Sequence, residues 1–251
     1  MGELDGRRAL VTGAAEGLGR AVAEVFVELG ARVMLSDVQD DLVAKEAAGL
    51  GAASVHCDVT VAADVEAAVA ATVDAFGGID IVVNNAGIEN IAALVDLKEE
   101  DLDRILAVNV KGVYFGIKYG APAIIASGGG AIVNMASVMG LGGCPLLGAY
   151  CATKAAVISL TQTAAVELRD HGVRVNAVCP TFAPTAMVAR GAPILEAALG
   201  QPLEPILAQV QGRLVTTREV ADAVAFLASN RSSFVNGIAF PVDNAMSSRL
   251  L

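Results

Sequence analysis

The chain contains no tryptophan, two histidines and four cysteines among its 251 residues. The cysteines show no metal-like pairing, and no histidine lies close to them at the spacing of a metal ligand, so we predict no bound metal. Cysteines without such a pattern are typical of the reduced thiols of a cytoplasmic protein.

Basic residues are also scarce. Lysine and arginine number 17 against 27 aspartates and glutamates, which gives a net charge of −10. Nucleic acids and anionic membrane surfaces both require basic patches on a protein partner, so this balance argues against both as partners.

Long apolar runs are missing as well. No stretch of about 18 uninterrupted apolar residues is present, so no membrane span is predicted. The first residues, MGELDGRRALVTG, begin with charges and reach only a short apolar run, which is not the pattern of a signal peptide. These absences predict a cytoplasmic location.

Hydrophobic residues, in contrast, make up 55% of the chain, and charged residues only 18%. This composition is far from that of a disordered protein, and a chain of this length can bury roughly three quarters of its unfolded surface. The surplus of apolar residues must enter a core or an oligomer interface.

Apolar runs of strand length alternate with segments of helical periodicity from end to end, which predicts βαβ units and a parallel sheet covered on both faces. We therefore expect an α/β fold: a single-domain, doubly wound Rossmann sheet of about seven strands over residues 1–251. One irregular region, 180–213, is a candidate substrate lid. The expected strands are 8–13, 31–37, 53–59, 79–87, 128–137, 173–180 and 237–243, and the expected helices are 17–29, 38–49, 61–76, 101–126, 149–171 and 216–229.

A glycine-rich stretch, TGAAEGLG, connects the first expected strand to the first helix and contains Gly13, Gly17 and Gly19. Glycines at this position let the backbone approach a pyrophosphate at a helix N-terminus, where free N–H groups and the helix dipole favour anions. The spacing differs from the usual G-x-G-x-x-G. A tight turn without a ligand is the alternative, but its place in the first βαβ unit favours a dinucleotide.

Asp37 ends the second strand, about twenty residues past the glycines, where a carboxylate can accept hydrogen bonds from an adenosine ribose. Glu16, inside the glycine-rich stretch, adds a second negative charge. A 2′-phosphate at about 4 Å from one such carboxylate would lose on the order of 4 kcal/mol at an effective dielectric near 20. We therefore predict NAD rather than NADP as the cofactor, although Asp37 could also be a solvated strand-end residue.

Two further strand ends carry polar residues at the same edge of the expected sheet. The sequence NNAG, Asn84 to Gly87, closes the fourth strand, and Asp58 ends the third. Ligands collect at the carboxyl edge of open α/β sheets, so both are candidates for cofactor binding. An ordinary Asn/Gly turn is the alternative reading of NNAG.

The pattern Tyr-x-x-x-Lys occurs twice, as Tyr114 with Lys118 and as Tyr150 with Lys154. The first pair lies midway along an expected helix without a partner motif, so we interpret it as structural. The second pair opens the helix that follows the fifth strand, and Ser137 ends that strand. A separation of four places Tyr150 and Lys154 on one helix face, so all three groups can meet at the carboxyl edge.

The ordered set T-G-x-x-x-G-x-G, N-N-A-G, Asn109, Ser137 and Tyr150-x-x-x-Lys154 resembles the short-chain dehydrogenase/reductase family over essentially the whole chain. The resemblance implies that Tyr150 is the catalytic acid/base and that Ser137 bonds the substrate oxygen. It further implies that Lys154 lowers the tyrosine pKa and holds the nicotinamide ribose, and that Asn109 holds a water behind the lysine. The implied cofactor site comprises Gly13, Glu16, Gly17, Leu18, Gly19, Asp37, Asp58, Val59, Asn85, Ala86, Gly87, Tyr150, Lys154, Pro180 and Thr185.

Two segments depart from the family pattern. The usual Pro-Gly-x-x-x-Thr is here Pro180 to Thr185 with Thr181 in place of the glycine, and a β-branched residue resists positive φ. We therefore expect a different loop path there. The usual Val-Asp-Gly-Gly becomes Val-Asp-Asn244-Ala245, and in the family this segment often lies at a subunit contact.

The expected substrate pocket has an apolar rim, which suits a lipophilic or cyclic secondary alcohol or ketone. Its residues are Glu89, the one charge, with Met139, Leu141, Cys144, Leu146, Leu147, Phe182 and Met187. An NADPH-dependent 3-oxoacyl-(acyl-carrier-protein) ketoreductase is the alternative enzyme, and a non-catalytic NAD-binding scaffold is the alternative of another class. The family resemblance also predicts a homotetramer formed through helices 101–126 and 149–171.

Overall fold

Short runs of aliphatic residues form seven parallel strands in the computed structural model, which describes residues 2–248. The strand order is β3-β2-β1-β4-β5-β6-β7, so the chain starts in the middle of the sheet and winds outward in both directions. The strands are β1 Arg8–Thr12, β2 Arg32–Asp37, β3 Ala53–His56, β4 Ile81–Asn84, β5 Gly130–Met135, β6 Val173–Pro180 and β7 Ala239–Val242. The predicted doubly wound Rossmann sheet is therefore confirmed; residues 1 and 249–251 of the predicted domain lie outside the described residues.

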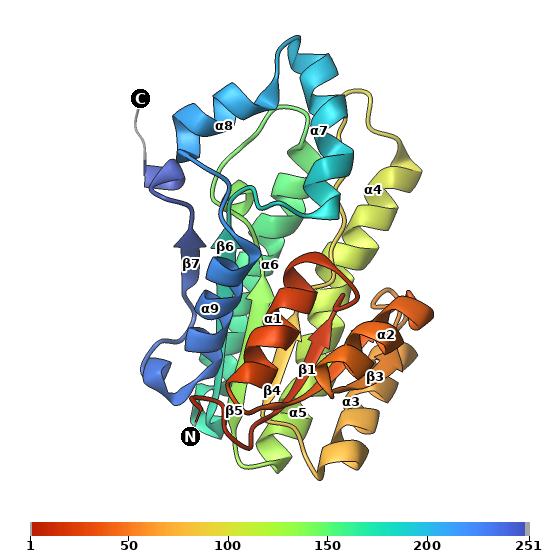
Figure 1. Cartoon of the computed structure of the whole chain (residues 1–251), viewed down its shortest axis with the longest axis vertical. Coiled ribbons are helices and arrows are strands. Elements are labelled where there is room, and N and C mark those ends of the chain that lie inside the picture. Colours follow the sequence, from red (N-terminus) through yellow and green to blue (C-terminus); the bar gives the residue numbers. More distant parts are fainter. Residues whose placement is uncertain (1, 249–251) are drawn as a thin grey trace.

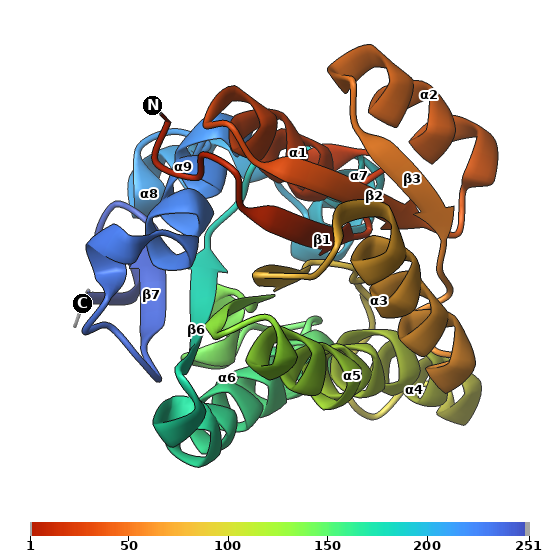
Figure 2. The same cartoon turned by 90° about the horizontal axis from the view of Figure 1, so that it is seen from below.

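Helices cover both faces of this sheet (Figure 1). Viewed from below, α1 and α9 lie on one side, and α3, α5 and α6 lie on the other (Figure 2). The helices are α1 Gly17–Glu28, α2 Asp40–Leu50, α3 Ala62–Phe76, α4 Glu99–Leu106, α5 Gly112–Ala126, α6 Gly148–Leu168, α7 Ala186–Leu199, α8 Leu203–Gln211 and α9 Thr217–Ala228. Within residues 2–248, no helix combines the length and the apolar character needed to cross a bilayer.

The five inner strands of the sheet are buried on both faces because neighbouring residues point into different cores, whereas the edge strands β3 and β7 are partly exposed. In β1, Val11 packs into the cluster under α1 and α9, whereas Leu10 packs into the cluster under α3, α5 and α6. Leu10 is aligned with Met34 of β2 and Val82 of β4, and all three enter the same core. This two-sided burial explains why the strands are continuous apolar runs without alternation.

Two expectations about helices were wrong. The segment 101–126 is not one regular helix, because a π-helical turn at Ala107–Lys111 separates α4 from α5. Such turns are frequent at functional sites. The region 180–213 is not irregular, since it contains α7 and α8 (Figure 1). The prolines of this region made its helices hard to predict from the sequence. Pro202 precedes the first turn of α8, however, where a proline removes no helical hydrogen bond.

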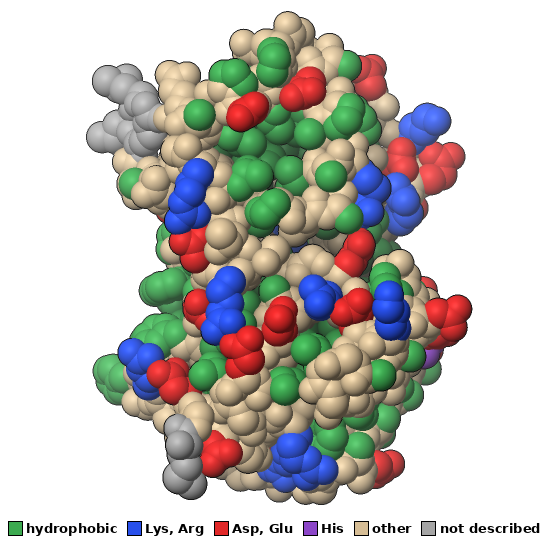
Figure 3. Space-filling model, in the orientation of Figure 1, with side chains coloured by type: hydrophobic (Ala, Val, Ile, Leu, Met, Phe, Trp, Pro, Cys, Tyr) green, Lys and Arg blue, Asp and Glu red, His purple; other side chains and the backbone are tan. Residues whose placement is uncertain are grey.

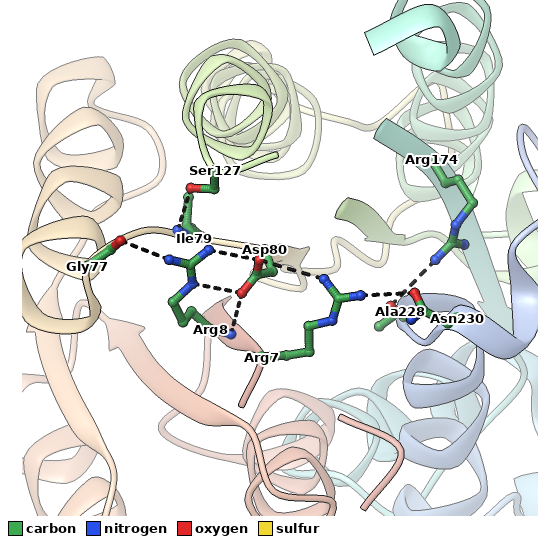
Figure 4. A network of polar contacts seen from close by, with 9 residues as sticks. All are labelled: Arg7, Arg8, Gly77, Ile79, Asp80, Ser127, Arg174, Ala228 and Asn230. Carbon is green, nitrogen blue, oxygen red and sulfur yellow. Dashed lines mark hydrogen bonds and ion pairs between the residues drawn. The ribbon is translucent and has the colours of Figure 1, made fainter. Parts of the chain in front are cut away.

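At the amino ends of the strands, an ion pair joins the start of β1 to the start of β4 (Figure 4). Arg8 donates from Nε to Oδ2 of Asp80 at 2.8 Å and from Nη2 to Oδ1 at 2.9 Å, and its backbone N–H also donates to Oδ2. Burial alone would raise the pKa of Asp80, but the hydrogen bonds from Arg8 lower it on balance. In the same view Arg7 reaches Asn230, so the brace extends toward α9.

We expect Asp80→Asn to lower the free energy of unfolding by about 2–4 kcal/mol, because the substitution leaves the Arg8 guanidinium without its carboxylate. The folded-state pKa of Asp80 is depressed, so its stabilisation is present at neutral pH and disappears as the pH falls through that value. Urea denaturation at pH 7 measures the loss. Asp101→Asn is the control, because the exposed Asp101–Arg104 pair contributes about 0.5 kcal/mol or less. Equal losses in both variants would contradict this role.

Candidate active site

A cavity of about 390 Å³ lies at the carboxyl ends of the strands, within the size range of ligand pockets. Its walls come from the strand ends, from the start of α1, from α6 and from α7. The predicted cofactor residues that line it are Gly13, Glu16, Gly17, Leu18, Asp37, Asp58, Val59, Asn85, Ala86, Gly87, Tyr150, Lys154, Pro180 and Thr185. Ser137 lines it too, as do five predicted substrate residues: Glu89, Met139, Leu147, Phe182 and Met187.

Five predicted site residues do not line this cavity, and one of them, Leu141, is exposed instead. Gly19 and Asn109 lie behind its wall, and their contacts are described below. Cys144 packs in a small cluster with Met139 and Tyr150, one layer away from the cavity. Leu146 turns instead toward the core of α7 and α8 and has a positive φ of 67°. Leu141, Cys144 and Leu146 thus lie outside the cavity that the other predicted substrate residues line.

The glycine-rich turn is held against the end of β4 more tightly than any side chain would permit. Gly13 has a φ of +63°, and a Cβ atom there would lie 2.7 Å from the Cα atom of Ala86. A Cβ on Gly19 would lie 2.2 Å from the carbonyl oxygen of Gly13. Gly19 therefore permits close packing of α1 on the turn. The backbone at Gly13 and Gly17 is left facing the cavity, as a cradle for a pyrophosphate requires.

Asp37 is buried at the end of β2, and both of its carboxylate oxygens are held in place. Oδ2 accepts a hydrogen bond from the N–H of Ala15 at 3.1 Å, and Oδ1 accepts one from the N–H of Gln39 at 3.1 Å. The carboxylate is thus fixed where it lines the cavity. Glu16, in contrast, forms an ion pair with Arg190 of α7 at 3.7 Å. This pair is solvent-exposed on both sides, whereas the Asp37 carboxylate is buried.

Ser137, Tyr150 and Lys154 meet at the centre of the cavity. The Ser137 hydroxyl donates to the carbonyl of Pro180 at 3.3 Å and accepts from the N–H of Met139 at 3.2 Å. Tyr150 and Lys154 project from the first two turns of α6. Nζ of Lys154 donates to the carbonyl of Met135 at 2.8 Å and lies 5.5 Å from the ring centroid of Tyr150.

Burial shifts both α6 groups toward their neutral forms. It raises the pKa of Tyr150, while a hydrogen bond with Ser137 acts in the opposite direction. It lowers the pKa of Lys154 to about 8. In the chain without a cofactor, desolvation of the phenolate outweighs the hydrogen bond with Ser137, so the pKa of Tyr150 lies above its ordinary value.

Asn109 lies fully buried in the π-helical turn, where its side chain holds the loop that follows NNAG. Its Oδ1 accepts from the N–H of Ile88 at 2.8 Å, and its Nδ2 donates to the carbonyl of Ile88 at 2.8 Å. The same Nδ2 donates to Oγ1 of Thr153, next to Lys154. Asn109 thereby links the loop after β4 to α6.

The two segments that depart from the family pattern differ in backbone conformation. Thr181 does not have a positive φ; its hydroxyl instead donates to Oε1 of Gln211 at 2.6 Å. Asn244 and Ala245 do have positive φ values, 49° and 65°. Their backbone thus keeps a conformation that favours glycine, at a cost to the alanine in particular.

Sequence reasoning missed Arg190, the only arginine among the described residues, 2–248, that line this cavity. No motif marks it, and its position depends on how α7 folds over the sheet.

The other Tyr-x-x-x-Lys pair lies outside the cavity. Tyr114 is half-exposed on α5, and its ring is tilted against the ring of Phe115. Hydrophobic side chains gather over α7 and α8 on the face of Figure 3. Within residues 2–248, no cluster of His, Cys, Asp or Glu could hold a metal ion.

Known proteins share this architecture. A family model described as "Enoyl-(Acyl carrier protein) reductase" matches residues 13–247. A sorbitol dehydrogenase from Cereibacter sphaeroides is 48% identical over 180 residues, which cover 70% of each chain. A mitochondrial borneol dehydrogenase from Lavandula x intermedia is 36% identical and covers 97% of this chain and 92% of its own.

The solved structures agree with the sequence relatives. A 3-ketoacyl-(acyl-carrier-protein) reductase from Brucella melitensis, complexed with NADH, superimposes with a TM-score of 0.87 at 34% identity and covers 97% of this chain and 99% of its own. The chain belongs to the short-chain dehydrogenase/reductase family, whose members use a nicotinamide cofactor. It is therefore an oxidoreductase acting on an alcohol or ketone.

The buried Lys154 gives a testable dependence of stability on pH. Its pKa is lowered from 10.5 to about 8, so above pH 8 the native state releases a proton that the unfolded state keeps, and stability rises with pH. Tyr150, whose pKa is raised, opposes this rise only above about pH 10. Between pH 7.5 and 9.5 the wild type should gain about 2 kcal/mol relative to Lys154→Met.

Urea denaturation of the protein without added cofactor measures this difference at the two pH values. Lys118→Met, which removes an exposed lysine of α5, is the matched control and should keep the wild-type slope. Parallel slopes for the wild type and Lys154→Met would show that Lys154 titrates normally in the folded chain.

Proposed function

We propose that the protein is an NAD-dependent oxidoreductase that transfers a hydride between the nicotinamide and a lipophilic or cyclic secondary alcohol or ketone, with Tyr150 as the acid/base. The observation that carries this proposal is the meeting of Ser137, Tyr150 and Lys154 in a single cavity that also contains the glycine-rich turn. A binding protein without catalytic activity would have no need of this arrangement.

The residues of the cavity fit a dinucleotide. Gly13 and Gly17 provide exposed backbone for the pyrophosphate, and the carboxylate of Asp37 is oriented to accept hydrogen bonds from the adenosine ribose. Lys154 and the residues after β4 would hold the nicotinamide half. When bound, the nicotinamide supplies the acceptor or donor of the hydride.

In the oxidation direction, Tyr150 would take the proton of the substrate hydroxyl while the carbinol carbon loses its hydride. Ser137 would donate a hydrogen bond to the same oxygen and fix its position. Lys154, held by the carbonyl of Met135, keeps a positive charge at the base of the site at neutral pH. This charge favours the phenolate form of Tyr150, against the desolvation that opposes it.

The fixed carboxylate of Asp37 supports NAD over NADP. It is buried and cannot turn away, because backbone N–H groups hold both of its oxygens. The NADH complex of the Brucella melitensis relative is in keeping with this choice. That relative also represents the alternative function, a ketoreductase acting on acyl-carrier thioesters. The apolar side chains of Met139, Phe182 and Met187 favour a small apolar substrate instead.

The remaining features of the proposal concern the whole chain. We infer that residues 1–251 act as one domain, with α7 and α8 as a lid over the substrate. Exposed apolar side chains on α5 and α6, Tyr114 and Val166 among them, support a homotetramer formed through these helices. A cytoplasmic location remains a prediction from the sequence.

Removing the tyrosine hydroxyl tests the mechanism. Tyr150→Phe should lower kcat with NAD⁺ and cyclohexanol by 1,000-fold or more, since proton transfer loses its only acceptor at about this cost. The dissociation constant of NADH, read from nicotinamide fluorescence, should change less than about threefold. Tyr114→Phe is the matched control and should retain wild-type activity. Substantial turnover by Tyr150→Phe would overturn the assignment.

Paired titrations with NADH and NADPH test the choice of cofactor. The wild type should bind NADH at least about 100-fold more tightly, because a 2′-phosphate would face the fixed carboxylate of Asp37. Asp37→Ser should narrow this ratio by 10-fold or more, whereas Asp41→Ser, on the exposed surface of α2, should leave it unchanged. Tighter NADPH binding by the wild type would favour the ketoreductase.

A further inference from the structure

Glu89 places an unbonded carboxylate in the substrate end of the cavity. It follows the NNAG turn and lines the same space as Tyr150, Met139 and Phe182. Its side chain is half-buried, and burial raises the pKa of the carboxyl group. Within residues 2–248, no hydrogen-bond donor lies within bonding distance of this carboxylate. Its oxygens are not among the fully buried polar atoms, so they face the cavity and are open to a donor from a bound ligand.

The surrounding structure confines this carboxylate instead of releasing it to solvent. The backbone of α7 packs directly on it at Gly191, where a Cβ atom would lie 2.5 Å from Oε1 of Glu89 and 3.0 Å from the side chain of Ile91. A larger residue at position 191 would displace either the carboxylate or the helix. The side chain thus remains below α7, close enough to Tyr150 to interact with it electrostatically.

We propose that Glu89 is a specificity-determining residue that accepts a hydrogen bond from a second hydroxyl group of the substrate, on the carbon next to the carbinol. This proposal rests on the proposed function and narrows its substrate class to vicinal diols, cyclic or open-chain. The rest of the substrate end is apolar, so the carbon skeleton packs on Met139, Phe182 and Met187 while its second hydroxyl reaches the carboxylate.

A hydroxyl fits this position better than an ammonium group does. Arg190 of α7 also lines the cavity and offsets the charge of Glu89, and Lys154 lines the same cavity. An ammonium would meet two cations and one carboxylate. A hydroxyl needs only a strong acceptor, and a hydrogen bond to its carboxylate also weakens the effect by which Glu89 disfavours the phenolate of Tyr150.

Three substrates of one skeleton test this role: cyclohexanol, trans-1,2-cyclohexanediol and trans-2-aminocyclohexanol, each with NAD⁺ and the full-length protein. The wild type should show a kcat/KM about 10-fold or more higher for the diol than for cyclohexanol. Glu89→Leu should lower the ratio of the diol value to the cyclohexanol value by 10- to 100-fold, because only the diol loses a hydrogen bond. The diol kcat/KM of Glu89→Gln, which keeps an acceptor oxygen, should lie between the values of the wild type and Glu89→Leu.

Glu66→Leu and Glu66→Gln, at an exposed position of α3, are the matched controls and should follow the wild type with all three substrates. NADH titrations of the Glu89 variants show whether each retains a folded cofactor site. Equal losses for diol and monoalcohol, or a wild type that prefers the amino alcohol, would overturn the role of Glu89 and leave the proposed dehydrogenase standing. No turnover of any of the three by the wild type would overturn both.

Discussion

The close approach of the glycine-rich turn to the end of β4 is the constraint on which the site depends. Thr12 accepts hydrogen bonds from the N–H groups of Asn85 and Ala86, while Asn85 donates to the carbonyls of Thr12 and Gly13. Only glycine fits where the two strand ends touch. This contact aligns the start of α1 with the loop after β4, and so places both halves of a dinucleotide site along one edge.

The catalytic groups sit in an environment that opposes their charged forms. Burial drives Tyr150 and Lys154 toward neutrality, and the hydrogen bonds that hold them come from Ser137 and from the carbonyl of Met135. Buried ionisable groups of this kind destabilise the folded chain, and any charge brought near them shifts their pKa strongly. Under the proposed function, the cationic nicotinamide would be a charge of that kind and would favour the phenolate of Tyr150 in the loaded site.

The sequence identified the site where its motifs follow predictable strands. Gly13, Asp37 and the NNAG turn end strands whose apolar runs are unmistakable, and all of them line the cavity. Prediction of site residues from the sequence failed where local signals compete with tertiary packing. Leu146 looks like a pocket residue but turns away, and Arg190 carries no motif although α7 brings it to Glu16.

By itself the sequence determined the sheet, its connections and the identity of the groups at its carboxyl edge, because apolar periodicity and strand-end motifs are local properties. Only the tertiary structure decided which charges meet. The ion pair of Glu16 with Arg190 and the confinement of Glu89 under Gly191 depend on how α7 covers the edge, and the raised pKa of Tyr150 depends on its burial. Burial and electrostatic pairing arise between segments distant in sequence, so no local pattern records them.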